Sequence, residues 1–271
     1  MVKVALMDLG SDVSSSFAQA VDLIGGIPDL NKPDQEVLVK VGVFAPKQEQ
    51  YTTIPVARAI VESFSKAPKL WFIESDNYRG TGTERLQIWR ELYSDRVLPF
   101  NLSEDSDTRT VSIAGEEMAL SHLLFESRVL VSSHTLRFYE KGSVIKNLFG
   151  LPPMKKKARF HKKLDLVLLD LFEVVGGIDL AILDGTFAYP GPGSGQKTRI
   201  PANVFLVGRD AVAVDAVGAA LMGMRPEKMP IIQEAMNRGL GEGNLDNIEV
   251  VGCDFSEMQE TIQPSRKRKK K

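Results

Sequence analysis

The residues most suggestive of chemistry follow an apolar run at positions 178–183. Asp184 comes directly after that run. In open α/β sheets ligands bind beyond the carboxyl ends of strands, so Asp184 is a candidate for acid/base catalysis or for holding a divalent cation. Three glycines follow whose amides could cradle an anion, because glycine permits positive φ and close backbone approach: Gly191, Gly193 and Gly195. A long surface turn accounts for the same loop equally well.

Two further carboxylates stand where a strand is expected to pass into an alanine-rich helix at residues 211–222. Asp210 precedes the helix, where its favoured role is to cap the helix by accepting amide hydrogen bonds, with ligand binding as the alternative. Asp215 falls inside the apolar helix, where a carboxylate is costly unless it is paired, hydrogen-bonded or metal-bound. Asp215 is therefore the second candidate for acid/base chemistry, or else has a structural partner.

Two lysines and one asparagine supply cations and an amide that could contact an anion. Lys40 interrupts an apolar run at residues 37–44, which suits equally a cation for phosphate or carboxylate and a lysine whose stem is buried while its head reaches solvent. Lys146 and Asn147 stand just before Gly150 and offer a second cation and an amide.

We expect these groups to meet at the carboxyl edge of the sheet, with Lys40, Asp184 and either Lys146 or Asp215 lining one cleft. Oxygen ligands would favour magnesium over zinc, although no residue is assigned as a metal ligand. A histidine among cations, such as His161, should stay neutral near pH 7, which permits general-base chemistry. The histidines lack the spacing of a zinc site: His122, His134 and His161.

Two glycine-containing segments resemble nucleotide-binding motifs without meeting their requirements. Gln196 stands where a phosphate-binding loop needs glycine before its lysine, and a strand rather than a helix is expected next. The glycines of residues 239–243 miss the dinucleotide-binding spacing and precede no helix. We interpret the first segment as an ordinary loop and the second as a turn.

Apolar, β-branched runs alternate with helical periodicity along the chain, which predicts an α/β fold. We expect a mainly parallel, mixed sheet flanked by helices in three layers. The expected strands cover residues 2–6, 37–44, 70–73, 128–132, 178–183, 202–207 and 248–251, with a short edge strand at 108–113. The expected helices cover residues 13–24, 55–64, 84–93, 164–175, 211–222 and 226–238, and Asp12 and Thr83 are expected N-caps. Because no repeat or linker interrupts it, we expect residues 1–263 to form a single domain.

Hydrophobic residues make up 43% and charged residues 25% of the chain, which is ordinary for a globular protein. No apolar run approaches the roughly 18 residues of a membrane span, and Asp8 comes too early for a signal peptide. The single cysteine, Cys253, allows neither an intramolecular disulfide nor a four-cysteine iron–sulfur cluster. We therefore expect a cytoplasmic protein without membrane contact and without an iron–sulfur cluster.

The formal net charge of −1 hides an asymmetry. The last six residues are all basic, and the remaining 28 basic residues face 35 acidic ones, a formal charge of −7. An acidic body argues against a nucleic-acid-binding fold. Residues 264–271 are expected to form a disordered solubilising tail, or alternatively to contact RNA, the ribosome or an acidic protein. The basic residues of that tail are Arg266, Lys267, Arg268, Lys269, Lys270 and Lys271.

The order of these segments resembles the domain of unknown function 362 family (DUF362) over nearly the whole chain. The resemblance rests on VLVK at 37–40, the threonine-rich approach to Pro55, VIKNLFG at 144–150, ILDG at 182–185, GPGSG at 191–195 and RDAVAVDAVGAALMG at 209–223. Some members of that family carry ferredoxin-like iron–sulfur modules, which imply redox chemistry for those members. This chain, with its one cysteine, resembles a divergent member without that module.

Two departures from the family pattern bear on function. Val41 and Gly42 follow the strand lysine where the family typically has Pro-Asn, and His134 and Arg137 stand in a region where the family usually shows lysine and histidine. If those positions do chemistry in relatives, this protein has altered or lost it.

Two hypotheses follow from the sequence. The first is an α/β protein that binds a small anionic ligand at the carboxyl edge of its sheet, with the reaction, if any, left open. The second is a non-catalytic interaction protein that kept the fold and uses its basic tail to engage RNA, the ribosome or another acidic surface. The first is the leading hypothesis, and the departure at Val41-Gly42 and the missing cysteines give weight to the second.

Overall fold

The structure, a computed structural model, describes residues 1–126, 128–190 and 199–263. Its strands are β1 (Val2–Asp8), β2 (Val37–Val41), β3 (Val43–Ala45), β4 (Gln50–Tyr51), β5 (Leu70–Glu74), β6 (Val97–Asn101), β7 (Thr108–Ile113), β8 (Glu116–Ser121), β9 (Val129–Arg137), β10 (Leu180–Tyr189), β11 (Ile200–Gly208) and β12 (Ile248–Gly252). Its α-helices are α1 (Val13–Leu23), α2 (Ile54–Ser63), α3 (Gly82–Leu86), α4 (Val144–Asn147), α5 (Leu164–Val174), α6 (Ala211–Leu221), α7 (Pro230–Asn237) and α8 (Phe255–Ile262). Two 3₁₀ helices also bear on the argument, η2 (Gln87–Leu92) and η5 (Ala158–Lys163).

Within the described residues, eight strands form one sheet in the order β12-β1-β11-β10-β9-β2-β5-β6. β11 runs antiparallel to its neighbours β1 and β10, and every other neighbouring pair is parallel. The predicted α/β fold with a mainly parallel, mixed sheet is confirmed. Because β9, β2 and β5 are parallel neighbours, their carboxyl ends meet at one edge of the sheet.

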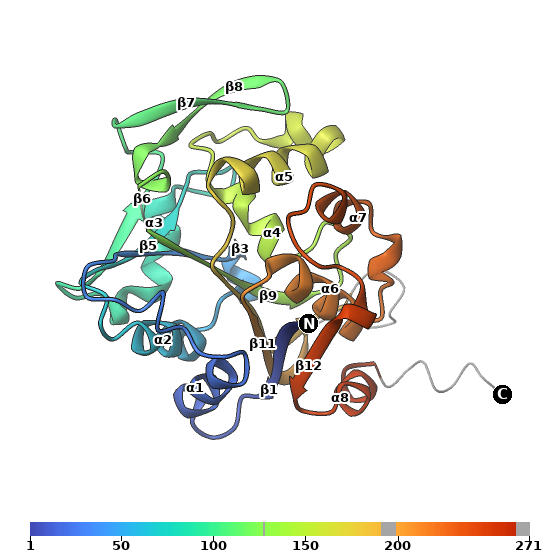
Figure 1. Cartoon of the computed structure of the whole chain (residues 1–271). Helices are drawn as coiled ribbons and strands as arrows, with labels where there is room; N and C mark the ends of the chain where they lie inside the picture. Colours follow the sequence, from blue (N-terminus) through green and yellow to red (C-terminus); the bar gives the residue numbers. More distant parts are fainter. Residues whose placement is uncertain (127, 191–198, 264–271) are drawn as a thin grey trace.

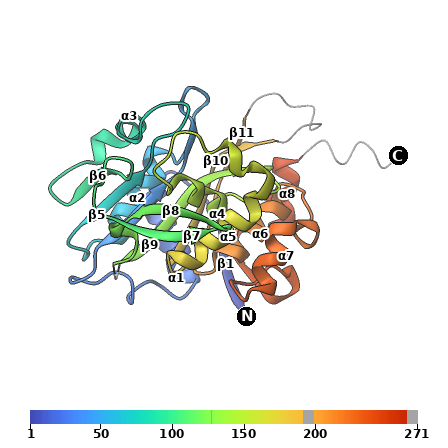
Figure 2. The same ribbon diagram turned by 90° about the horizontal axis from the view of Figure 1, so that it is seen from above.

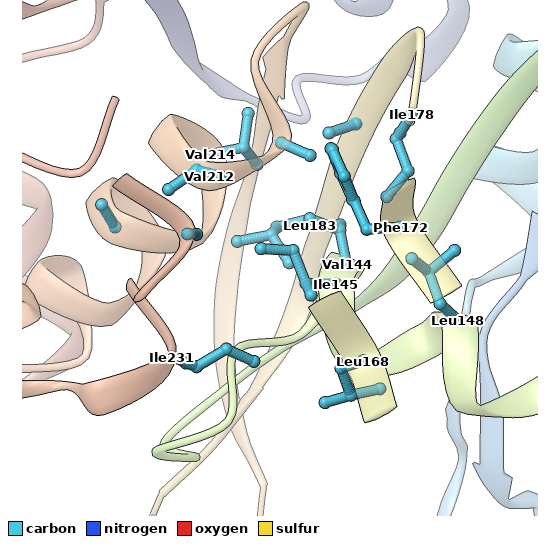
Figure 3. Close-up of a cluster of buried hydrophobic side chains, with 14 of the residues drawn as sticks. Val144, Ile145, Leu148, Leu168, Phe172, Ile178, Leu183, Val212, Val214 and Ile231 are labelled. Atoms are coloured by element: carbon cyan, nitrogen blue, oxygen red, sulfur yellow. The ribbon is translucent and has the colours of Figure 1, made fainter. Parts of the chain in front are cut away.

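Helices cover both faces of the sheet (Figure 1). One face, called here the α1–α2 face, buries Phe17 of α1 and Ile60 of α2 against the strands. The other, called the α4–α7 face, buries Ile145 of α4 and Leu168 of α5 together with residues of α6 and α7, as Figure 3 shows. Burying a side chain of this size stabilises the fold by about 1.5–3 kcal/mol. Two apolar layers thus hold the sheet between helices.

The segment 108–113, expected as an edge strand, does not join the main sheet. β7 pairs in antiparallel fashion with β8 across a tight turn whose two central residues, Ala114 and Gly115, both have positive φ (52° and 77°). Figure 2 shows this hairpin alongside α5, and the backbone amide of Ala114 donates to Asp170 on that helix at 2.7 Å. The next strand in sequence satisfies the backbone hydrogen bonds of β7, so β7 needs no place at the edge of the main sheet.

The strand expected over residues 37–44 is divided at Gly42. β2 ends at Val41, and β3 pairs with β4 in a separate two-stranded sheet. Gly42 packs directly on the ring of His134, and a Cβ at this position would lie 2.5 Å from His134 Cγ. The departure to Val41-Gly42 therefore makes room for a histidine on β9.

Helix termini agree with the sequence at Asp12 and differ at Thr83. Asp12 accepts amide hydrogen bonds from Ser14 and Ser15 and caps α1, as predicted. Thr81, not Thr83, caps α3 and forms a capping box with Glu84. The helix expected over residues 84–93 breaks into α3 and η2. None of the helices among the described residues is both long and apolar enough to cross a membrane.

Candidate functional site

A cavity of about 440 Å³ lies where β2, β5 and β9 end, beside α4. The cationic side chains that line it are Lys40, Arg85, Arg137, Lys146, Lys155 and Lys157. Among its described lining residues, Glu74 is the one carboxylate. The walls of the cavity therefore carry an excess of positive charge.

Lys40 reaches the cavity because of strand alternation. Val37 and Val39 of β2 pack on the α1–α2 face and Leu38 on the opposite face, which directs Lys40 toward α4. The side chain is fully buried, and its Nζ donates to Glu74 Oε2 at 2.9 Å and to Asn147 Oδ1 at 3.1 Å. Burial lowers the pKa of Lys40, and the Glu74 carboxylate opposes that shift. Of the two roles open from the sequence, the snorkelling lysine is wrong, because the head group never reaches solvent.

Glu74, at the end of β5, is shared between two buried cations. Besides Lys40, Arg85 Nη1 lies 3.4 Å from Glu74 Oε2, and the backbone amide of Ser75 donates to Oε1 at 2.8 Å. Arg85 also donates to the backbone carbonyls of Val43 and Ser75, while its buried Nε has no hydrogen-bond partner among the described residues. One negative charge is thus divided between two positive ones.

Asn147 connects α4 to the two central strands. Its Nδ2 lies within hydrogen-bonding distance of the carbonyl oxygen of Lys40 (2.7 Å), the carbonyl oxygen of Ser133 (3.1 Å) and Ser132 Oγ (3.2 Å). With Oδ1 accepting from Lys40 Nζ, both ends of the amide are occupied. Asn147 therefore positions Lys40 and α4 even though it lines the cavity.

Gly150 is required by this packing. A Cβ at that position would lie 2.5 Å from Lys40 Cε and 2.7 Å from Glu74 Oε1. Such a contact is shorter than two non-bonded atoms tolerate, so a side chain there would displace the ion pair.

Lys146 and Lys157 differ from Lys40 in that neither forms an ion pair with a carboxylate in the part of the chain that the structure describes. Lys146 Nζ lies 4.4 Å from the ring centre of Phe149, a cation–π contact. Lys157 is buried, and its Nζ donates to Ser75 Oγ at 2.7 Å and to the carbonyl oxygen of Phe149 at 3.1 Å. Burial, reinforced by neighbouring cations, lowers the pKa of each lysine to about 7.

His134 and Arg137, at the end of β9, complete this part of the wall, His134 as a neutral donor and Arg137 as a cation. The backbone amide of Thr135 donates to His134 Nδ1 at 2.7 Å, which leaves the proton of the neutral ring on Nε2. Burial, with the nearby cations, holds the pKa of His134 well below its usual range. Arg137 Nε donates to Ser143 Oγ at 3.0 Å, and its guanidinium lies 5.0 Å from the ring centre of Tyr139.

Asp184 does not line the cavity, so the expectation that it shares one cleft with Lys40 is wrong. Leu180 and Ile182 of β10 pack on the α1–α2 face, and Asp184 continues that series. Its Oδ2 accepts from the amide (2.6 Å) and hydroxyl (2.7 Å) of Thr53 at the start of α2, and its Oδ1 from the amide and hydroxyl of Thr186. These four hydrogen bonds give the carboxylate a structural role.

Asp215 also lies outside the cavity and is buried under the start of α4. Its carboxylate accepts from three consecutive backbone amides, those of Ser143 (2.8 Å), Val144 (3.0 Å) and Ile145 (3.0 Å). Burial raises its pKa to about 6 despite these hydrogen bonds. The structural partner expected for Asp215 is therefore the amino end of α4, the helix that carries Lys146 and Asn147.

Asp210 caps α6, the role favoured from the sequence. Its Oδ1 accepts from the amide of Ala213 at 2.9 Å, and its Oδ2 accepts from the amide of Glu242 at 2.8 Å. The second bond ties α6 to the glycine turn at residues 239–243. Asp210 is not among the described lining residues of the cavity.

The remaining sequence expectations concern the glycine loop, the tail and metals. Gly191, Gly193 and Gly195 lie outside the described residues, as do residues 264–271. Across residues 1–126, 128–190 and 199–263, no group of three or more histidine, cysteine, aspartate or glutamate side chains is placed to hold a metal ion. Asp184 and Asp215, for which cation binding was an alternative to acid/base chemistry, do not share a site, because the two carboxylates bind different helix starts.

Sequence reasoning missed Glu74 and Arg85. Glu74 directly follows the expected strand at residues 70–73, and its place at a strand end was the available signal. Arg85 had none, because it lies in a helix and enters the site only through the packing of α3 beside β5.

One protein-family model matches residues 37–220, from the first residue of β2 into α6, and is described as a domain of unknown function (DUF362). The chain belongs to the DUF362 family. The matched range includes every described residue that lines the cavity. β1 and β12, the pair at one end of the DUF362 sheet, lie outside it. A comparison with curated proteins finds no match.

Proposed function

We propose that this DUF362 protein binds a small anionic ligand in the cavity beside α4. The observation that carries the proposal is that Arg137, Lys146 and Lys157 line the cavity without an ion-pair partner among the described residues. The other cations in the wall are paired, Lys40 and Arg85 with Glu74 and Lys155 with Asp76. Asp215 acts on Arg137, and Glu74 acts on Lys146 and Lys157, only at distances longer than an ion pair. Half-buried or buried cations without a close counter-charge are costly, and a bound anion would offset that cost.

Several groups are available to contact an anion directly. Lys146 is the leading candidate, because the one contact of its ammonium group found within residues 1–126, 128–190 and 199–263 is the ring of Phe149, so it can donate hydrogen bonds to an anion. His134 offers an Nε2 proton, and the buried Nε of Arg85 has an unused donor. A carboxylate or phosphate is held best by several donors around its oxygens, and the residues that carry these three donors all line one cavity.

Binding should be coupled to proton uptake. Lys146 and Lys157 each have a pKa of about 7, so at pH 8 each is mostly neutral. A bound anion favours the ammonium form and raises both pKa values, so protons are taken up as the ligand binds. Affinity for the anion should therefore increase as the pH falls from 9 to 7.

The test is isothermal titration calorimetry with phosphate and a small dicarboxylate at pH 7 and pH 9, in buffers of different ionisation enthalpy. We expect tighter binding at pH 7, with proton uptake, and a loss of roughly 10- to 150-fold in Lys146→Met, the range for a hydrogen bond to a charged group. Lys156→Met is the matched control, because Lys156 is exposed, neighbours Lys157 and does not line the cavity. Absence of binding, or equal binding by Lys146→Met, would refute the proposal.

The proposal covers binding and assigns no reaction. Asp184 and Asp215, the residues expected to act as acids or bases, have both carboxylate oxygens occupied by backbone or hydroxyl donors away from the cavity. Burial lowers the pKa of Lys146 and that of Lys157 to about 7. These two amines and the imidazole of His161, which also lines the cavity, are the candidates to exchange a proton with a bound ligand.

A further inference from the structure

The exposed aromatic rings of this protein are gathered at the cavity. Among the described residues, the exposed aromatic side chains are Phe44, Tyr78, Phe138 and Tyr139. All four line the cavity, although they come from three separate segments: β3, the loop after β5 and the segment after β9. Exposed aromatic rings are costly to leave in water, so their gathering at one opening indicates something that covers them.

Two arginines hold this aromatic rim in place. The guanidinium of Arg79 lies 4.7 Å from the ring centre of Phe44 and 5.0 Å from that of Tyr78, so one cation bridges two segments. Arg137 stands in the same way beside Tyr139 at 5.0 Å. Such contacts fix the rings and reduce the ordering that binding would otherwise require.

The cavity is therefore polarised along its depth. Of the six cationic residues in the wall, Lys40, Arg85 and Lys157 are buried, Arg137 and Lys146 are half-buried and Lys155 is exposed. The rings of the rim are exposed, Tyr78 by 72%. A volume of about 440 Å³ is many times the roughly 30 Å³ that one water occupies, so a single inorganic anion leaves most of it unfilled. Cavities of this size and partly apolar lining fit organic ligands.

We propose that the ligand is a planar ring that carries a carboxylate or phosphate, with the anionic group at the buried cations and the ring stacked on the aromatic rim. This inference rests on the proposed anion binding and specifies the rest of the ligand, its planar ring. A flat ligand ring stacks on the face of a Tyr or Phe ring whatever hydrogen-bonding groups the ligand carries, so the rim selects planar ligands. The phosphate and carboxylate versions share this chemistry and are separated by experiment.

The experiment measures dissociation constants for two ring-bearing anions and their ring-free counterparts: adenosine monophosphate against ribose 5-phosphate, and 2-naphthoate against hexanoate. We expect each ring-bearing anion to bind at least tenfold more tightly than its counterpart, and the tighter of the two to identify the anionic group. Tyr78→Ala should weaken the ring-bearing ligand by about 5- to 150-fold, the range for loss of one stacking contact, and leave the ring-free anion unchanged. Tyr78 is largely exposed, so its substitution should leave the fold intact. Leu166→Ala, another exposed apolar residue that does not line the cavity, is the control.

The outcomes separate this inference from the proposed function. If ring-free anions bind as tightly as ring-bearing ones, and neither Tyr78→Ala nor Phe138→Ala changes the affinity, anion binding stands and the planar-ring ligand is refuted. Hexanoate binding as tightly as 2-naphthoate would indicate an aliphatic ligand and refute it as well. If none of the four anions binds, both proposals fail.

Discussion

Replacing Glu74 by glutamine tests whether the buried charge cluster holds the site together. The substitution keeps the shape of the side chain and removes its negative charge, which Lys40 contacts at 2.9 Å and Arg85 at 3.4 Å. Two buried cations then lose their counter-charge, and breaking a buried pair in this way costs about 3–5 kcal/mol. Neutralising Lys40 instead at pH 7 costs roughly 4.6 kcal/mol, from an unperturbed pKa of about 10.4, and sets a similar limit. The melting temperature should fall by about 6–20 °C.

Urea denaturation of four proteins measures this effect: wild type, Glu74→Gln, Lys40→Met and the double variant. We expect the double variant to be less destabilised than the sum of the single variants, by about 0.5–3 kcal/mol, because its two changes remove the same interaction. Glu117→Gln, on the exposed side of β8, should change stability by less than about 0.5 kcal/mol. A loss below about 1 kcal/mol for Glu74→Gln, with additive single variants, would show that the cluster does not stabilise the fold.

Three further predictions concern Lys146, Asp215 and the basic tail. The pKa of Lys146 is about 7 in the folded protein and about 10.4 in the unfolded chain, so above pH 7 the unfolded chain binds more protons. The wild type should therefore gain up to about 1.4 kcal/mol of stability per pH unit relative to Lys146→Met. A constant difference between the two proteins in urea denaturation at pH 7, 8 and 9 would contradict this. Asp215→Ala leaves three amides at the start of α4 without their acceptor, so the free energy of unfolding should fall by about 1–3 kcal/mol. Because α4 carries Lys146, the variant should also bind anions more weakly. Unchanged calorimetric affinity in a folded variant would show that α4 keeps its position without this cap. If the tail contacts RNA, as the sequence suggests, deletion of residues 266–271 should abolish binding of labelled RNA and leave the thermal melt unchanged. For the full chain, the slope of log affinity against log salt concentration should be no steeper than about −4 to −5. Undiminished binding by the truncated chain would place the contact elsewhere.

Strands and helices that consist of apolar runs could be predicted from the sequence. Strand segments that consist of buried polar residues could not. β9 was expected only over residues 128–132, yet it continues to Arg137. Three of the five added residues, Ser133, His134 and Thr135, are polar and typical of loops in sequence but are buried here. Ser133, for example, pairs with Thr52 through both its hydroxyl and its carbonyl oxygen. Such residues fit a strand only because distant partners satisfy them, and a single sequence does not display those partners.

Site residues could be predicted where the alternation of side chains along one strand decides their position. They could not be predicted where the pairing of strands far apart in sequence decides it. Lys40 was identified because it breaks an apolar strand, and the same alternation, extended along β10 from Ile182, would have placed Asp184 on the opposite face of the sheet. Glu74, in contrast, is 34 residues from Lys40, and they meet only because β2 and β5 are parallel neighbours in register. Strand order, rather than local pattern, assembles the charge cluster.

The position of β1 in the sheet has a consequence for how the chain is made. β1 lies between β11 and β12, and its only described sheet neighbours begin at Ile200 and Ile248. A ribosome that adds about 5–20 residues per second needs roughly 10 to 40 seconds after β1 to complete the first of these partners. During that interval the apolar segment Val4, Ala5 and Leu6 has no strand to pair with and is open to chaperones or to aggregation. β1 is therefore synthesised long before either of the strands that flank it in the sheet.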